Sequence, residues 1–223
     1  MGQEYIRNIN ILTTLPDLSS LVYKSDFNNG INLKNTVSGF DYVFNLEESY
    51  SLFPGFSLRL ATRIDNAAAG DKFKIYKPVF LNPSKLIVMD FYMYYPQEAG
   101  LKYINFGFTN HGQANTLQAN LRHEYLTEEW SYESADGVFT VMDIPLVSLQ
   151  YAYWHHIQGV FNFNSAKFVE LTCDEQRIDI SAYPVLSTAP SATLGNEFFI
   201  TLEAADAFQP QLVLQKILIS TIR

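Results

Sequence analysis

Apolar and polar side chains alternate along most of this chain, in short runs separated by turn-forming residues. A period of two is typical of a β-strand with one buried face, because successive side chains of a strand point to opposite sides. Pairs such as Asn29-Gly30 and Asp136-Gly137 mark turns between the runs. No long segment repeats its apolar residues at helical spacing. The chain is therefore expected to be all-β.

The alternating runs predict many short strands. Their ranges are Tyr5 to Leu12, Leu21 to Phe27, Ser57 to Thr62, Lys72 to Val79, Lys85 to Tyr95, Leu101 to Thr109, Leu117 to Tyr125, Trp130 to Glu133, Val138 to Met142, Tyr153 to Phe163, Lys167 to Cys173, Arg177 to Ile180, Phe198 to Glu203 and Leu212 to Ile222. Strands at this spacing form a sandwich or a barrel. No repeat or linker divides the chain, so residues 1–223 are expected to form one domain.

Composition narrows the class of protein further. Hydrophobic residues make up 48% of the chain and charged residues 17%, which is enough apolar material for a core and excludes disorder. A net charge of −8 repels phosphate backbones and anionic lipids. Nucleic acid and membrane are therefore not expected as partners.

The single cysteine and the N-terminus indicate the compartment. Cys173 is alone, so no disulfide forms within the chain, and its apolar neighbours predict a buried, inert thiol. The first residues lack a signal-peptide pattern, and no stretch approaches the roughly 20 apolar residues of a membrane span. We expect a cytoplasmic protein, or a secreted one if an export signal has been trimmed.

One stretch carries a resemblance to a known family. Trp154 to Phe163 is followed by Lys167 to Leu171, then by Asp174-Glu175-Gln176-Arg177 and Ile178-Asp179-Ile180-Ser181. It resembles the laminin-G-like and concanavalin A-like pattern, in which Trp-His precedes a long strand and a short turn leads to a second strand. More loosely, Ser25 to Gly30, Gly55 to Leu60 and Gln211 to Ile222 resemble the opening, early inner and closing strands of such domains. The resemblance implies a two-sheet antiparallel jelly-roll sandwich.

Alternation also assigns faces to the strands. In the run from Lys85, Ile87 to Tyr95 at odd positions form the core side. If this run and the next two form a meander, their other sides make one continuous surface. It carries Asp90, Tyr92, Tyr94, Tyr103, Asn105, Gln118, Asn120, Arg122 and Glu124. His156 is added as a further candidate, on the strand face it shares with Trp154 and Gln158. The alternative is a solvated outer face without a ligand.

These residue types suit a carbohydrate or a sugar-derived small molecule. Flat aromatic rings lie against the apolar side of a pyranose, while amides, carboxylates and Arg hydrogen-bond with hydroxyl groups. The leading hypothesis is a non-catalytic, lectin-like module with its saccharide over Tyr92, Tyr94 and Tyr103. Trp130 and Tyr132 could rim the groove, although a core position suits Trp130 better.

An enzyme on the same groove is the second hypothesis. Glucan hydrolases of this fold carry carboxylates at alternate strand positions, about 5 to 5.5 Å apart. Here Glu47-Glu48, Glu128-Glu129 and Asp174-Glu175 are adjacent and would point to opposite faces, so that signature is absent. A weaker catalytic set combines side chains of several strands in acid, base and substrate-binding roles. Its members are Asp90, Arg122, Glu124 and His156.

Metals and assembly complete the expectations. The histidines lack zinc-site spacing. A structural calcium ion is the one metal considered, with Asp26 or Asp206 as an oxygen ligand, and no other cofactor is expected. A third reading makes the aromatic-bearing face the interface of a homodimer.

Overall fold

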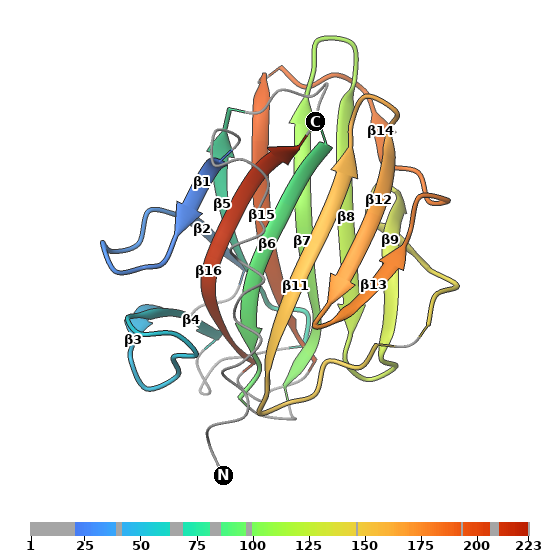
Figure 1. Ribbon diagram of the computed structural model, residues 1–223. Helices are drawn as coiled ribbons and strands as arrows, with labels where there is room; N and C mark the ends of the chain where they lie inside the picture. The colour runs from blue at the N-terminus through green and yellow to red at the C-terminus, as the bar shows by residue number, and fades with distance from the viewer. Residues whose placement is uncertain are drawn as a thin grey trace.

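Two antiparallel β-sheets lie face to face in the computed structural model (Figure 1). The structure describes residues 21–38, 42–62, 69–80, 86–96, 100–145, 147–192, 194–205 and 210–222. These ranges contain strands and no α-helix, so no helix among them is long and apolar enough to cross a membrane. The predicted two-sheet jelly-roll sandwich is confirmed.

Sheet A is the nearer layer in Figure 1 and has the order β13-β12-β11-β6-β16-β4-β3, with β1 also paired to β16. Its strands are β1 (Leu21–Ser25), β3 (Tyr42–Glu47), β4 (Ser57–Thr62), β6 (Leu86–Tyr94), β11 (Trp154–Asn162), β12 (Lys167–Cys173), β13 (Gln176–Asp179) and β16 (Gln211–Ile222).

Sheet B lies behind it and has the order β10-β9-β8-β7-β15-β5-β2, with β14 also paired to β8. Its strands are β2 (Lys34–Ser38), β5 (Lys72–Val79), β7 (Leu101–His111), β8 (Thr116–Glu124), β9 (Glu129–Ala135), β10 (Val138–Val141), β14 (Leu186–Thr188) and β15 (Gly195–Ala204).

The core lies between the sheets and follows the predicted alternation. The odd positions of β6 from Ile87 to Met93 are fully buried, as are Phe106 and Phe108 of β7. Phe91 meets Phe106 edge to face, with ring centroids 5.3 Å apart. Trp130 is 2% exposed and its indole Nε1 donates to the Val147 carbonyl, so it is a core residue and does not rim a groove.

Most predicted strands are found within a residue or two of their ranges, and β4, β5 and β12 have the predicted bounds. The structure adds β2, β3 and β14, which were not predicted. The predicted strand Tyr5 to Leu12 lies outside the described residues. Short strands with few alternating residues give too weak a pattern to identify.

Candidate functional site

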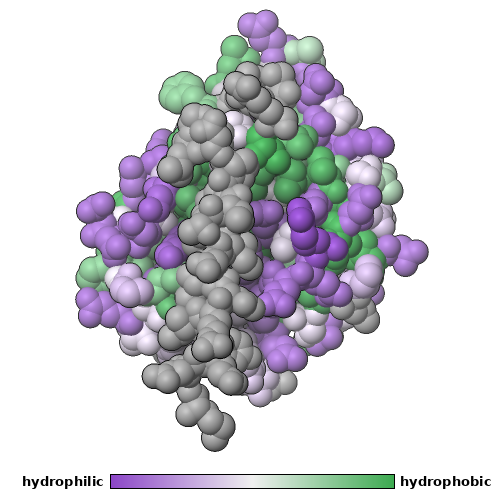
Figure 2. Space-filling view, viewed as in Figure 1, coloured by the Kyte–Doolittle hydropathy of each residue, from purple (hydrophilic) through white to green (hydrophobic). Residues whose placement is uncertain are grey.

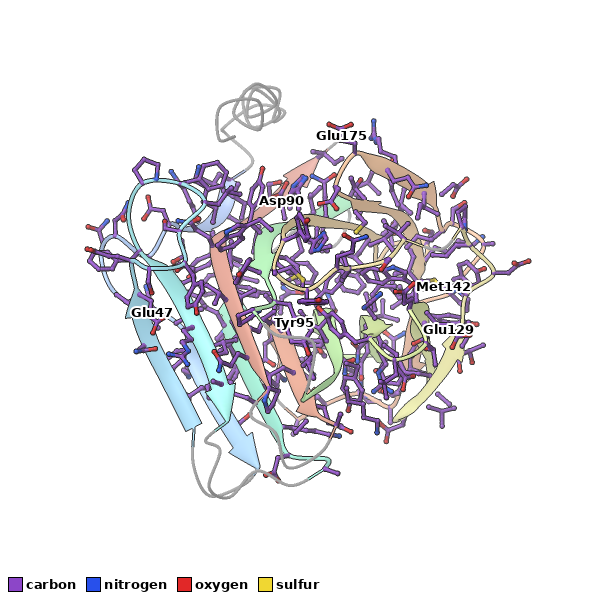
Figure 3. The ribbon with its side chains drawn as sticks, turned by 90° about the horizontal axis from the view of Figure 1, so that it is seen from below. Glu47, Asp90, Tyr95, Glu129, Met142 and Glu175 are labelled. Carbon is purple, nitrogen blue, oxygen red and sulfur yellow. The ribbon has the colours of Figure 1, made fainter. Side chains whose placement is uncertain are left out.

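The predicted binding face is divided between the two outer surfaces of the sandwich. β6 pairs with β11 and β16 in sheet A, whereas β7 and β8 pair with each other in sheet B. The expected meander of these three strands, and the single surface built on it, are therefore wrong. In Figure 3, Asp90 of β6 and Glu129 of β9 lie well apart. Asp90, Tyr92, Tyr94 and His156 belong to sheet A, and Tyr103, Asn105, Gln118, Asn120, Arg122 and Glu124 belong to sheet B.

Asp90 is a buried polar group on the outer face of sheet A. It is 3% exposed, and its Oδ2 accepts a hydrogen bond from Gln158 Nε2 at 2.9 Å. Gln158 lies directly opposite Asp90 across the β6–β11 ladder. His156 Nε2 is 3.1 Å from Asp90 Oδ1, although the two atoms lack the alignment of a hydrogen bond. Asp90 thus contacts two side chains of β11: the amide of Gln158, which donates a hydrogen bond, and the imidazole of His156.

Tyr92 lies between two rings in a row that crosses the sheet. Its ring stacks on His156, its partner in the β6–β11 register, with centroids 4.8 Å apart and planes inclined by 23°. Phe53 meets the Tyr92 ring edge to face at 4.9 Å. Burial, and then the charge of Asp90, raise the pKa of Tyr92 to about 12, so its phenol stays protonated at neutral pH.

A second row of aromatic rings runs parallel to the first, two residues away along β6 and β11. Tyr94 stacks on Tyr50, with centroids 5.4 Å apart and planes inclined by 28°. On its other side Trp154, its β11 partner, has its ring centroid 5.5 Å away. All three side chains are only partly buried, so this row keeps aromatic surface open to solvent.

Gln215 anchors the loop that supplies Tyr50 and Phe53. Its Oε1 accepts hydrogen bonds from the amides of Leu52 and Phe53, at 3.0 and 3.1 Å. The register of β16 against β6 shifts between Gln215 and Leu218, because three steps along β16 oppose two along β6. This is a β-bulge, which inserts one extra residue into a strand and bends it. The bulge therefore lies where the loop crosses the face.

Asp174, in the turn between β12 and β13, holds the beginning of β11. Its Oδ1 accepts from the backbone N–H of His156 at 2.9 Å, and its Oδ2 lies 2.9 Å from Nδ1 of His155. Burial alone would raise the pKa of Asp174, but these hydrogen bonds and the nearby histidines lower it below its ordinary value. Asp174 is therefore ionised at neutral pH.

On the outer face of sheet B, Arg122 is held between two aromatic rings. Its guanidinium carbon lies 3.8 Å from the ring centroid of Tyr103 and 3.4 Å from that of Phe139, and its Nε donates to Asn105 Oδ1 at 2.9 Å. Burial lowers the pKa of Arg122, and the Tyr103 phenol, Glu203 and other acids oppose that effect. The face of the Tyr103 ring is occupied by this cation.

The remaining sheet B candidates are Tyr103, Gln118, Asn120 and Glu124. The Tyr103 hydroxyl donates to Glu203, which also pairs with Lys72 at 3.2 Å and Lys102 at 3.0 Å. Burial, and then Glu203, raise the pKa of Tyr103 well above its ordinary value. Asn120 Nδ2 donates to Glu133. In the β7–β8 register Glu124 lies opposite Tyr103, and Gln118 lies opposite Thr109.

The predicted catalytic set is divided in the same way. Asp90 and His156 meet on sheet A, but Arg122 and Glu124 lie on sheet B. Since the core separates the two outer faces, one substrate cannot touch all four side chains. The combined set is wrong, and only the Asp90–His156 pair remains together.

Metal ligands are not gathered in the described part of the chain. It holds no group of three or more His, Cys, Asp or Glu side chains placed to bind an ion. Asp26 forms an ion pair with Lys24 at 3.9 Å and accepts from the Asn28 amide, while Asp206 lies outside the described residues. Cys173 is fully buried, and burial raises the pKa of its thiol well above the ordinary value.

Several side chains of the sheet A face were not predicted. Tyr50 and Phe53 come from a loop whose position depends on Gln215, and no local pattern reports such a contact. Gln215 itself gave a signal, because it interrupts the apolar run Leu212-Val213-Leu214. A polar residue inside a buried strand usually has a specific partner.

Comparisons with known proteins were informative at the level of fold. No protein-family model and no curated protein matches the sequence. Among solved structures, the cellulose-induced protein Cip1 matches with a TM-score of 0.59 and 10% identity, over 90% of this chain and 98% of its own. A carbohydrate esterase of the Shiga toxin-encoding bacteriophage phi24B matches with a TM-score of 0.55 and 10% identity, over 91% of this chain and 98% of its own.

A sialidase gives a TM-score of 0.55 and 14% identity over 90% of this chain, and this chain spans only 18% of the sialidase's length. At these identities the likenesses show a shared fold and no more. The resemblance to concanavalin A-like jelly rolls is confirmed in that sense.

Proposed function

We propose that the outer face of sheet A binds a saccharide, with Trp154 and Tyr94 as its aromatic platform. Tyr94 and Trp154 lie on β6 and β11 beside the polar group of Asp90, His156 and Gln158, and Tyr50 stacks on Tyr94 from a loop. This juxtaposition carries the proposal. Rings that remain open to solvent suit the apolar face of a sugar, while a carboxylate and an amide suit its hydroxyl groups.

The spacing favours an oligosaccharide over a single sugar. The Trp154–Tyr94 pair and the Gln158–Asp90 pair are four residues apart along β11 and β6. At about 3.3 Å per residue this separation is about 13 Å. An extended ligand running along the strands reaches both pairs. Figure 2 views the molecule from this side, and hydrophobic and hydrophilic side chains lie next to one another on its described part.

The outer face of sheet B is a weaker candidate, because its aromatic ring is already used. Tyr103 is 3% exposed, and Arg122 covers its ring. A sugar would have to displace a guanidinium that Asn105 also holds. The names of two proteins similar in fold, a carbohydrate esterase and a sialidase, agree with a saccharide ligand but identify no residue here.

The test begins with a glycan array, followed by calorimetry on the best oligosaccharide. Trp154→Ala and Tyr94→Ala are each expected to weaken binding at least tenfold, which is about 1.4 kcal/mol. Phe80→Ala is the matched control, because Phe80 is 99% exposed and its loss removes an aromatic ring without removing packing. Unchanged affinity in Trp154→Ala would exclude this site, and an array without any bound glycan would exclude the function.

The pair of Asp90 and His156 favours a second candidate, an enzyme acting on the same saccharide. Asp90 Oδ1 lies 3.1 Å from His156 Nε2 and can stabilise a charged imidazolium, which leaves Nδ1 to exchange a proton with a substrate. His156→Ala and Asp90→Asn are then expected to abolish the release of new reducing ends from oligosaccharides, whereas His111→Ala is not. Turnover that persists in His156→Ala would leave binding as the sole function.

A further inference from the structure

His155 points into the molecule between two residues that point outward. It is 4% exposed, while Trp154 and His156 lie on the outer face of sheet A. Both of its ring nitrogens are hydrogen-bonded: Nδ1 lies 2.9 Å from Asp174 Oδ2, and Nε2 lies 2.9 Å from the backbone carbonyl of Gln150. A carbonyl oxygen and an ionised carboxylate only accept hydrogen bonds. The two contacts therefore require both nitrogens to carry a proton.

Three separate parts of the chain meet at this imidazolium. Gln150 belongs to the irregular segment 147–153 that precedes β11, and Asp174 belongs to the β12–β13 turn. Asp174 also accepts from the His156 amide, and its own amide donates to the His156 carbonyl at 2.7 Å. Glu175, the next residue of this turn, lies in the same upper part of Figure 3 as Asp90. The contacts of His155 thus fix the end of β11 that bears Trp154 and His156.

We propose that His155 is a proton-dependent latch that regulates the saccharide face of sheet A. With its imidazolium in place, segment 147–153 and the β12–β13 turn hold Trp154 and His156 in register with Tyr94 and Tyr92. When His155 loses one proton, either Asp174 or the Gln150 carbonyl faces a nitrogen lone pair in place of an N–H, and segment 147–153 loosens. The regulation rests on the proposed saccharide function, whereas the latch itself does not.

The surroundings of His155 agree with this role. Burial alone would lower the pKa of His155, but its hydrogen bonds to Asp174 and Gln150 and the charge of Asp174 raise it above its ordinary value. The titratable group that faces it from sheet B is His123 of β8, and burial, together with His155, lowers the pKa of His123 to about 3. His123 is therefore neutral near pH 7 and does not repel the imidazolium.

The direction of the pH dependence follows from the raised pKa of His155. Below the pKa of an unfolded histidine, near 6.5, the contribution of His155 to stability is complete. It is lost as the pH rises through the higher pKa of the folded state. The latch is closed below about pH 6.5 and opens as the pH rises through the raised pKa of folded His155.

The experiment combines NMR titration of His155 with amide hydrogen exchange and glycan affinity across that range. The Ala152 amide, which donates to the Tyr95 carbonyl at 2.6 Å, and the Asp174 amide report on the two sides of the latch. After correction for the intrinsic pH dependence of exchange, their protection is expected to fall at least tenfold as His155 loses its proton. The affinity for the saccharide falls over the same range.

Asp174→Asn is the test variant, because an amide oxygen still accepts from the His156 amide while the negative charge is removed. It is expected to lower both the pKa of His155 and the pH at which protection is lost. Asp136→Asn is the control, since Asp136 is an exposed residue of the β9–β10 turn and the same charge is lost there. Its transition stays at the wild-type pH.

The outcomes separate the two proposals. Protection that falls with the titration of His155, in a protein that binds no glycan at any pH, supports the latch and overturns the saccharide function. Protection that stays constant while His155 loses its proton overturns the latch, whatever the protein binds. A transition that does not move in Asp174→Asn also overturns it.

Discussion

Gln215 hydrogen-bonds with both backbone polar groups of Phe53: its Oε1 accepts from the Phe53 amide and its Nε2 donates to the Phe53 carbonyl, each at 3.1 Å. Gln215 is 1% exposed and also donates to Ser51 at 2.8 Å. One side chain of sheet A therefore satisfies the backbone of the loop that covers it. The arrangement has a measurable consequence for stability.

Gln215→Ala is expected to lower the free energy of unfolding by about 1–3 kcal/mol, because it leaves buried backbone groups without partners. Saccharide affinity falls with it, since Tyr50 and Phe53 lose their support. Urea denaturation and calorimetry measure the two effects. Gln118→Ala, on the partly exposed face of sheet B, should change stability by less than about 0.5 kcal/mol. Equal stability of the two variants would contradict the anchoring role.

Arg122 is expected to stabilise the fold without contacting the ligand. Arg122→Lys keeps the charge but loses the planar group between Tyr103 and Phe139, at a cost of about 1 kcal/mol. Glycan affinity should remain at the wild-type value. The matched change Arg177→Lys affects a side chain that is 73% exposed and should be nearly neutral in urea denaturation. A selective loss of binding in Arg122→Lys would instead return the site to sheet B.

His123 makes the protein sensitive to acid. It is fully buried, neither ring nitrogen has a hydrogen-bond partner among the described residues, and its pKa is lowered to about 3. Because the folded pKa lies below that of the unfolded chain, the contribution to stability is present above about pH 6.5 and is lost as the pH falls. Each pH unit in that range costs about 1 kcal/mol at most.

This slope is checked by urea denaturation between pH 7 and pH 4. His123→Leu is expected to lose less stability over that range than the wild type. Parallel slopes in the two proteins would show that His123 is not the responsible group.

Gly107 is required by the close approach of β7 and β8. A Cβ at this position would lie 1.8 Å from the Ala119 carbonyl oxygen, a backbone atom that cannot move without breaking the ladder. Gly107→Ala is expected to cost about 3 kcal/mol or more. Gly137→Ala meets no atom within 4 Å and costs about 1 kcal/mol through its positive φ alone. Thermal unfolding of the two variants compares these costs, and similar melting temperatures would contradict the steric argument.

The sequence allowed the fold to be predicted because alternation reports burial directly. Ile87, Met89 and Phe91 were assigned to the core from their spacing alone, and all three are fully buried. The assignment of strands to sheets failed, since alternation does not say which partners a strand pairs with. β6 and β7 are consecutive in the chain but belong to different sheets. Asp90 of β6 therefore lies beside Gln158 of β11, whereas Asn105 of β7 lies beside Arg122 of β8. Only pairing between distant segments decides which side chains share a surface.

The candidate site was predicted in part for the same reason. Tyr92, Tyr94 and His156 were named and do lie together on sheet A. Tyr103 was named for its residue type, but its ring lies under Arg122 on the opposite side of the sandwich. The supporting contacts of Gln215 and Asp174 involve loops, where no periodicity marks a partner.

The position of β16 determines when sheet A can form. This strand joins β6 to β4 and also pairs with β1, so Leu214 meets Leu58 and Met93 on either side. Without residues 211–222, β3 and β4 would share no edge with the ribbon formed by β6, β11, β12 and β13. Pairings across such long sequence separations slow folding. During synthesis, the surface bearing Tyr92 and Tyr94 is therefore completed only after β16 has been made, more than a hundred residues later. Until then, the edge of β6 that pairs with β16 is open to other chains.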